Sequence, residues 1–155
     1  MTRILLFSAM LLMLASCRKS TEYEEFVTIS DAWNNRNLVH FNVNIRDTVT
    51  SQNVYISVRH SGKYEFSNLY LFVTAESPNG NIKRDTVEMV LADEHGKWQG
   101  KGAASVFTLY YPYKTNVRFP VAGIYTFTIE QAMWIRDLKN ISNIGLMIEK
   151  AGKSK

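Results

Sequence analysis

The sequence predicts an all-β protein, an antiparallel two-sheet β-sandwich with an Ig-like or jelly-roll-like arrangement. Apolar residues recur with period two along most of the chain, turn signals separate these runs, and no run shows the 3.6-residue period of an amphipathic helix. A single sheet would leave its apolar face in water, so we expect two sheets packed face to face. The alternation does not fix the strand order, and a small open barrel is an alternative.

The N-terminal segment predicts export and lipid attachment. Residues 1–16 combine Arg3 with a short apolar run from Ile4 to Ala15, which is typical of a signal peptide. A helix of that length spans about 18 Å, against roughly 30 Å of hydrocarbon, so a permanent membrane span is not expected. Leu14-Ala15-Ser16-Cys17 has the form of a bacterial lipobox, and we predict that Cys17 carries the lipid.

The rest of the chain has the length of one domain. We assign residues 17–25 to a lipidated, solvated tether, because residues 18–25 are polar and charged, and residues 26–155 to a single β-sandwich domain. Cys17 is the only cysteine, so the domain contains no disulfide and its stability must come from packing.

Alternating runs and the turns between them predict the strands in order. Six runs each hold three apolar residues spaced two apart: 41–45, 54–58, 69–73, 87–91, 125–129 and 144–148. Turn signals lie at 61–62, 78–81, 93–96 and 120–123. The Asn79-Gly80 pair is the strongest hairpin signal, because both residues tolerate positive φ. Gly123-Ile124-Tyr125-Thr126-Phe127 is similar to a tyrosine corner, in which a tyrosine bonds back to nearby backbone.

The charge balance argues against a nucleic-acid-binding surface. Of the 18 Lys and Arg, one is Arg3 in the leader, so 17 stand against 14 Asp and Glu in the rest of the chain. A nucleic-acid site would need basic residues clustered on one face with stacking aromatics between them. We therefore expect no nucleic-acid partner.

Polar residues do not form a recognisable catalytic or metal-binding set. His40, His60 and His95 lack metal-ligand spacing, and no cysteine is left to complete a zinc site. Asp93-Glu94-His95-Gly96 is the densest polar group, but its position at a strand end with a closing glycine favours a surface turn over proton transfer. We expect no enzyme activity, no cofactor and no metal.

Aromatic residues supply the candidate binding surface. Tyr70 and Phe72 alternate with apolar residues, so the strand at 69–73 is apolar on both faces and something should cover the second face. The first interpretation is that the protein's own segment around Phe107 and residues 110–113 folds over it. The second is a docking surface for a protein partner, because tyrosine and tryptophan are common interface anchors. The residues predicted to bind a partner are Tyr70, Phe72, Tyr110, Tyr111 and Tyr113.

Several segments closely resemble the gliding motility lipoprotein GldH family of Bacteroidetes. They are Ser67-Asn68-Leu69-Tyr70-Leu71-Phe72, Leu91-Ala92-Asp93 with Gly96-Lys97-Trp98, Tyr113-Lys114 with Asn116-Val117-Arg118-Phe119-Pro120, and Gly123 to Phe127 running into Glu130-Gln131-Ala132-Met133. The lipobox, Trp33 and the closing 144–150 segment also fall in family order. Trp134 departs from the basic residue expected there, which leaves the detail of the 134–143 loop open.

The resemblance implies a non-enzymatic lipoprotein of the cell envelope. Its partners would be the membrane, through the lipid on Cys17, and envelope proteins of the gliding and type IX secretion machinery. Surface-exported lipoproteins of this phylum carry acidic residues just after the cysteine, whereas Arg18-Lys19 follow it here. We therefore expect the outer membrane, with the domain facing the periplasm. The alternative function is carbohydrate or ligand binding, since Trp98, Trp134 and several tyrosines could stack on sugar rings.

Overall fold

The computed structural model describes residues 21–103 and 105–152. The predicted signal peptide at 1–16, Cys17 and residues 18–20 lie outside the described residues. Every regular element within the described part is a β-strand. The eleven strands are β1 (Thr21–Thr28), β2 (Ala32–Asn34), β3 (Val39–Ile45), β4 (Gln52–Ser61), β5 (Asn68–Glu76), β6 (Ile82–Val90), β7 (Lys101–Ala103), β8 (Val106–Val117), β9 (Gly123–Gln131), β10 (Asp137–Lys139) and β11 (Ile141–Lys150). Over this part of the chain, no helix of the length and hydropathy needed to cross a membrane was found.

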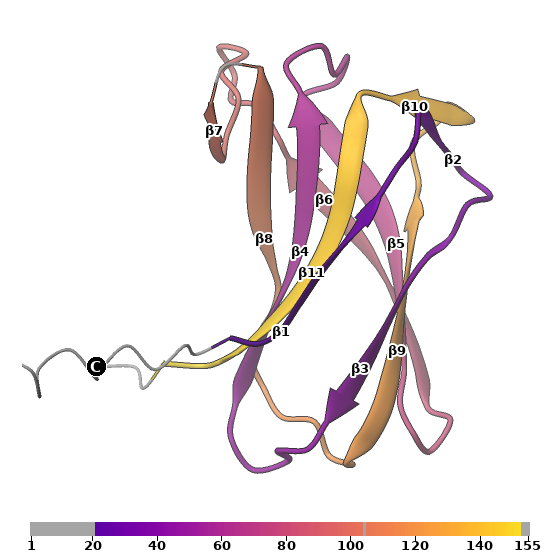
Figure 1. The fold of residues 1–155 in the computed structure, drawn as a ribbon, viewed down its shortest axis with the longest axis vertical. Helices are drawn as coiled ribbons and strands as arrows, with labels where there is room; N and C mark the ends of the chain where they lie inside the picture. Colours follow the sequence, from indigo (N-terminus) through magenta and orange to yellow (C-terminus); the bar gives the residue numbers. More distant parts are fainter. Residues whose placement is uncertain (1–20, 104, 153–155) are drawn as a thin grey trace, which may run out of the picture.

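Two antiparallel sheets form the predicted sandwich (Figure 1). The five-stranded sheet has the order β1-β11-β4-β8-β7, and the four-stranded sheet has the order β3-β9-β5-β6. A small ribbon of β2 and β10 lies at one end. The all-β, two-sheet prediction is therefore confirmed, and the strand order is now fixed.

The core lies between the two sheets and is built by the predicted alternation. Strand β3 is the clearest case, with a strictly alternating pattern of buried and exposed side chains from Val39 to Ile45. All six predicted runs lie in or at the end of strands β3, β4, β5, β6, β9 and β11, and their apolar residues are buried. Trp33 of β2 is fully buried, and its indole Nε1 donates to the Asn37 carbonyl at 2.8 Å, so it closes one end of the core.

The predicted hairpin joins β5 to β6 through residues 77–81. The Gly80 N–H donates to the Ser77 carbonyl at 2.9 Å, and the Ser77 N–H donates to the Asn81 carbonyl at 2.9 Å. Only Gly80 of the predicted pair has positive φ, at 81°. This arrangement fits a tight turn over Pro78-Asn79 followed by a left-handed glycine.

The predicted link from Tyr125 to nearby backbone is also present. The Val121 N–H donates to the Tyr125 hydroxyl at 3.4 Å, and the Tyr125 ring packs edge-on against Phe119 with ring centres 4.9 Å apart. These contacts hold the turn before β9 against the end of the core.

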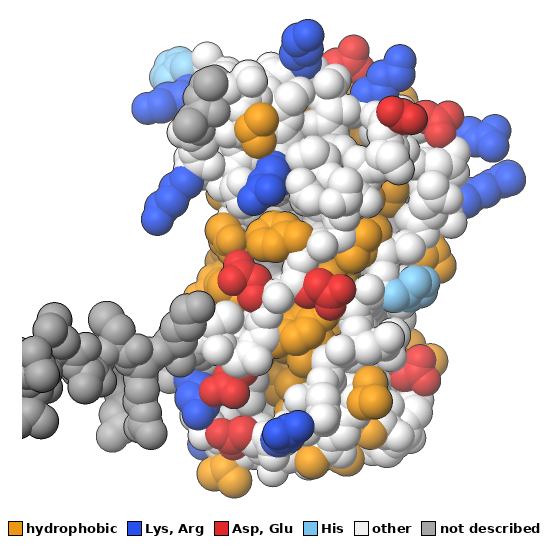
Figure 2. All heavy atoms as spheres, viewed as in Figure 1, with side chains coloured by type: hydrophobic (Ala, Val, Ile, Leu, Met, Phe, Trp, Pro, Cys, Tyr) orange, Lys and Arg blue, Asp and Glu red, His pale blue; other side chains and the backbone are white. Residues whose placement is uncertain are grey.

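The tether assignment is wrong for residues 21–25. Strand β1 begins at Thr21 and pairs with β11 along its whole length, from Thr21 opposite Glu149 to Thr28 opposite Asn143. Tyr23 and Val27 pack against the core, and hydrophobic side chains are visible along the line between β1 and β3 (Figure 2). The polar sequence reflects an edge strand whose outward side chains are charged, and Glu22 pairs with Lys150 at 3.1 Å.

Candidate functional site

The five aromatic residues predicted to bind a partner lie on three separate surfaces. Tyr70 and Phe72 lie on the outer face of the four-stranded sheet, because their neighbours Leu69 and Leu71 are fully buried in the core. Tyr110 lies on the outer face of the five-stranded sheet. Tyr111 and Tyr113 face inward along the opening between β6 and β8.

The first interpretation of the doubly apolar strand is therefore wrong. Strand β8, which carries Phe107 and residues 110–113, is hydrogen-bonded to β4 in the five-stranded sheet. It cannot cover the outer face of β5, which belongs to the four-stranded sheet. Period-two patterning does not reveal which sheet a strand joins, because that is decided by long-range pairing.

Arg84 of β6 covers Phe72. Its guanidinium carbon lies 4.5 Å from the centre of the Phe72 ring, and its nitrogens donate to the two Glu130 carboxylate oxygens at 2.6 and 3.3 Å. Thr86 is opposite Phe72 in the register, which places Arg84 on the adjacent diagonal. The predicted hairpin at 78–81 fixes this register, so the contact between Arg84 and Phe72 could have been predicted from the sequence.

Tyr70 remains partly exposed beside an unusual loop. Its backbone carbonyl accepts from the Ala132 N–H at 2.8 Å, and its own N–H donates to the Met133 sulfur at 3.3 Å. These bonds fix the loop after β9 next to Tyr70. Trp134, one residue further on, is fully exposed to solvent. A hydrogen bond to the Glu88 carboxylate raises the pKa of the Tyr70 phenol, so the hydroxyl stays protonated and acts as a donor.

We define the docking face as the outer surface of the four-stranded sheet around Tyr70, together with Trp134. Its polar surroundings are Glu88, Arg84 and Glu130. Tyrosine and tryptophan with a polar rim are the usual composition of a protein-binding surface. Trp134 is not among the residues predicted to bind a protein partner, since the exposure of a tryptophan is not visible in the sequence.

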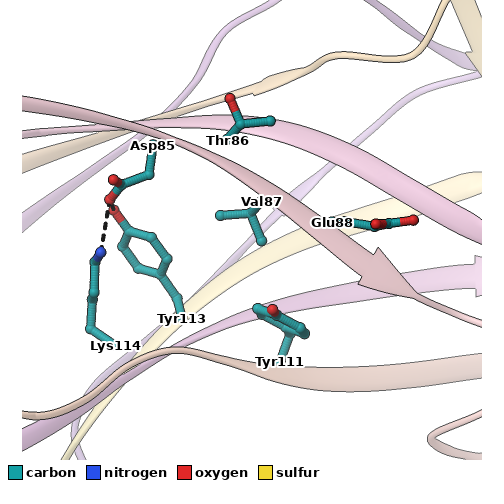
Figure 3. A pocket seen from close by; sticks show the side chains of 7 residues that line it. All are labelled: Asp85, Thr86, Val87, Glu88, Tyr111, Tyr113 and Lys114. Carbon is teal, nitrogen blue, oxygen red and sulfur yellow. Dashed lines mark hydrogen bonds and ion pairs between the residues drawn. The ribbon is translucent and has the colours of Figure 1, made fainter.

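A cleft lies between the two sheets where β6 faces β8, on the side of the sandwich away from β1 and β3. Its larger part has a volume of about 620 Å³ and an apolar floor that includes Val54, Phe119 and Phe127. Across it, the Tyr113 hydroxyl donates to Asp85 Oδ2 at 2.6 Å, and Lys114 Nζ lies 2.9 Å from the same oxygen. Figure 3 shows both side chains converging on Asp85 from β8.

The electrostatics of this bridge are those of a structural contact. The hydrogen bond from Tyr113, followed by that from Lys114, holds the pKa of Asp85 below its usual value. Burial, followed by the hydrogen bond to Asp85, raises the pKa of Tyr113. At neutral pH an ionised carboxylate therefore accepts from a neutral phenol and a lysine, which ties the two sheets together at this edge.

The two tryptophans of the carbohydrate alternative do not share a cleft. The Trp98 ring packs against His60 at 4.7 Å and Phe107 at 6.1 Å between ring centres, whereas Trp134 is fully exposed in the loop after β9. The rings of Phe119 and Phe127 in the β6–β8 cleft are more than nine-tenths buried. They offer little face on which a sugar could stack.

The polar candidates are also dispersed. Within residues 21–103 and 105–152 there is no group of three or more His, Cys, Asp or Glu side chains able to hold a metal. Asp93 accepts from the backbone N–H groups of His95 at 3.0 Å and Lys97 at 2.9 Å, which confirms the predicted turn. His40 is exposed on β3, and His60 is buried among aromatic rings.

Comparison with known proteins decides the family, because the GldH lipoprotein family matches residues 21–148. The chain belongs to the GldH lipoprotein family. A protein of Christiangramia forsetii named gliding motility lipoprotein GldH homolog is 30% identical, over 96% of this chain and 95% of its own. The gliding motility lipoprotein GldH of Flavobacterium johnsoniae is 31% identical, over 95% of this chain and 94% of its own.

Membership of a lipoprotein family makes this GldH-family protein a membrane-anchored protein of the cell envelope. Among solved structures, a chain in the structure of infectious bursal disease virus Gx strain shows 16% identity, covering 89% of this chain and 36% of that one. Its TM-score of 0.28 is too low to bear on the fold.

Proposed function

We propose that the protein is a non-catalytic docking component of the gliding motility machinery and of the associated type IX secretion apparatus. A lipid on Cys17 anchors it to the outer membrane on the periplasmic side, and the docking face binds an envelope protein. The family match and the names of the two relatives support the machinery. The dispersed polar groups of the described residues favour binding over catalysis.

The position of Trp134 is the main support for the docking face. Its side chain is fully exposed, so it contributes no packing to the fold. Two hydrogen bonds, made by Ala132 and Met133, nevertheless hold the backbone just before Trp134 against Tyr70. An exposed tryptophan in a loop that is fixed next to a partly exposed tyrosine is the arrangement expected of an interface anchor.

The described chain begins in the five-stranded sheet, whereas the docking face belongs to the four-stranded sheet. Cys17 precedes Thr21 by four residues, a reach of at most about 14 Å for an extended chain. Strand β1 belongs to the five-stranded sheet, so we propose that this sheet faces the membrane. The docking face of the four-stranded sheet then points away from the bilayer, where a partner can reach it.

The experiment compares partner recovery with folding for Trp134→Ala and Tyr70→Ala in the full-length protein. Loss of an interface anchor typically costs about 2 kcal/mol, or roughly thirtyfold in affinity, so we expect recovery of the crosslinked partner from membranes to fall sharply. The melting temperature should change little for Trp134→Ala. Val49→Ala is the matched control, because Val49 is 76% exposed but lies in the loop between β3 and β4.

Partner recovery that stays at the wild-type level in both variants would show that the docking face does not bind the partner.

The anchor is tested separately by Cys17→Ala, which should release the protein from the membrane fraction and abolish labelling with palmitate. Protease added to intact cells should spare the wild-type protein and cut it once the outer membrane is opened. Ready digestion in intact cells would place the domain on the cell surface.

A further inference from the structure

Strand β6 is an edge of the four-stranded sheet. Among the described strands it pairs with β5 alone, and the nine residue pairs run from Asn68–Val90 to Glu76–Ile82 without a register shift. Sandwich edges are usually blunted by proline, bulges or unpaired inward charges. Strand β8 on the same side has Pro112 and two register shifts against β4, whereas β6 has neither. Two charged side chains of β6 face inward: Lys83, which is exposed, and Asp85, whose carboxylate is neutralised by Tyr113 and Lys114.

The outward side chains of β6 are unusually exposed for their type. Val87 and Met89 point into the core, so the outer side chains are those at even-numbered positions. Ile82 at one end of the strand is 64% exposed, and Val90 at the other end is 47% exposed. Neither is explained by the packing of the single chain.

Geometry restricts how such a strand can pair with its own copy. In an antiparallel pair, opposite residues lie on the same face, and both turn their backbone groups either toward each other or away. Two identical strands meet this condition only when one residue lies opposite itself. Each allowed register is therefore defined by the residue that lies opposite its own copy. If the next residue along the strand takes this place, every cross-strand pair changes.

The β6 sequence is self-complementary about Thr86. With Thr86 at the centre, Arg84 lies opposite Glu88 twice, and Ile82 lies opposite Val90 twice. Opposite charges and matched aliphatic residues directly across an antiparallel pair are favourable. Registers centred on Arg84, Asp85 or Glu88 would instead place a charge opposite its own copy.

We infer that β6 pairs with β6 of a second copy of this chain in the register centred on Thr86, giving one continuous eight-stranded sheet. Both charged side chains lie on the outer face, and each already has a partner within its own chain. Arg84 is held by Glu130 above Phe72, and Glu88 accepts from the Asn68 amide at 2.7 Å. The exposed Ile82 and Val90 then cover each other at the two ends of the new strand pair.

The symmetry of this dimer suits a membrane-anchored protein. The twofold axis of an antiparallel strand pair is normal to the sheet, so both five-stranded sheets lie on one side and both docking faces on the other. Both anchors can then enter one bilayer. Anchoring in one membrane also raises the effective concentration of the copies, which favours an interface that is small by the standards of soluble dimers. The inference does not depend on what binds the docking face.

A cysteine at the centre tests the register. In full-length protein in isolated membranes treated with a mild oxidant, Thr86→Cys should form a disulfide-linked dimer, because opposite Cα atoms of an antiparallel pair lie about 4.5–5.5 Å apart, within disulfide range. Arg84→Cys is the register control. Position 84 and its own copy are offset by four residues, about 14 Å, so this variant should not crosslink. Crosslinking of both variants to the same extent, or of neither, would overturn the inference.

Charge reversal tests the pairing independently. In the Thr86→Cys background, Glu88→Arg places Arg opposite Arg84, and Arg84→Glu places Glu opposite Glu88, so each variant alone should crosslink at least about tenfold less. Co-expressed, the two variants restore both opposite-charge pairs and should crosslink with each other. Thermal melting of each variant checks that it folds. Crosslinking that is unchanged in the single variants, or absent from the co-expressed pair, would contradict this register.

Discussion

The outer faces of the two sheets carry similar aromatic residues and differ in the contacts that these residues make. On the five-stranded sheet, Phe26 lies over Gly145, and Tyr110 meets the Phe26 ring edge-on at 6.3 Å while its hydroxyl donates to Glu24 at 2.9 Å. On the four-stranded sheet, Tyr70 is 36% exposed against 41% for Tyr110, whereas Trp134 in the loop after β9 is fully exposed. The difference between the two faces therefore rests on Trp134, whose side chain nothing covers, and this residue is the binding candidate.

The groove on the five-stranded sheet depends on Gly145, which gives the largest expected effect. A Cβ at this position would meet the Ser57 hydroxyl and would lie 2.8 Å from the Phe26 ring. We expect Gly145→Val to lower the free energy of unfolding by about 3 kcal/mol, because the overpacked groove must displace Phe26. Chemical denaturation measures this change. Gly152→Ala is the control, since nothing lies within 4 Å of the added Cβ, and equal stability of both variants would show that the groove is not tightly packed.

Phe26→Ala and Trp134→Ala test the contrast between the two faces directly. Phe26 is half-buried and touches Tyr110, with the Arg59 guanidinium carbon 5.4 Å from its ring centre. Its removal should cost about 2 kcal/mol of folding stability. Trp134→Ala should leave stability within about 0.5 kcal/mol of wild type, because the side chain is fully exposed. A larger loss for Trp134→Ala than for Phe26→Ala would reverse the assignment of the two faces.

The sequence predicted the central strands of both sheets, but not which of their outward side chains are covered by neighbouring residues. Runs such as 69–73 and 144–148 show their strand nature through alternation alone, because the inward residues must be apolar. Strand β8 gave no such signal, since Tyr110 points outward and Tyr111 inward and the two look identical in sequence. Strand β1 was hidden by its charged outer residues. Coverage depends on which strands are neighbours, and those pairings join residues as far apart in the sequence as Thr21 and Glu149.

The pH dependence of folding should come from the interior and not from either outer face. His60 on the inner side of β4 is fully buried; its Nδ1 donates to the Ser61 carbonyl at 3.0 Å, and Nε2 has no partner. Burial lowers the pKa of His60, so the folded protein holds it neutral while the unfolded chain takes up a proton near pH 6.5. Its contribution to stability is therefore complete above about pH 6.5 and is lost as the pH falls from there toward the lower folded pKa.

Melting temperatures between pH 7.5 and 5 measure this loss, which one proton limits to about 1.4 kcal/mol per pH unit. His60→Gln should flatten the profile. His40→Gln and His95→Gln should keep it, because both histidines are exposed. A profile that is unchanged in His60→Gln would assign the titration to another group.

The bridge across the β6–β8 cleft gives the smallest expected effect. Tyr113→Phe removes one hydrogen bond to Asp85 but leaves Lys114 beside the carboxylate. We expect a loss of about 1 kcal/mol in folding stability and no change in partner recovery, because Tyr113 faces the cleft and not the docking face. Loss of recovery at unchanged stability would move the partner site to the cleft.

The most direct test of the docking face is site-specific photocrosslinking in intact cells. A photoreactive phenylalanine analogue replaces Trp134 in one strain and Tyr110 in another, so that each outer face carries one probe. The account predicts a discrete protein adduct from position 134 and none of that mass from position 110. An adduct from position 110 with none from position 134 would contradict it, because the partner would then bind the five-stranded sheet.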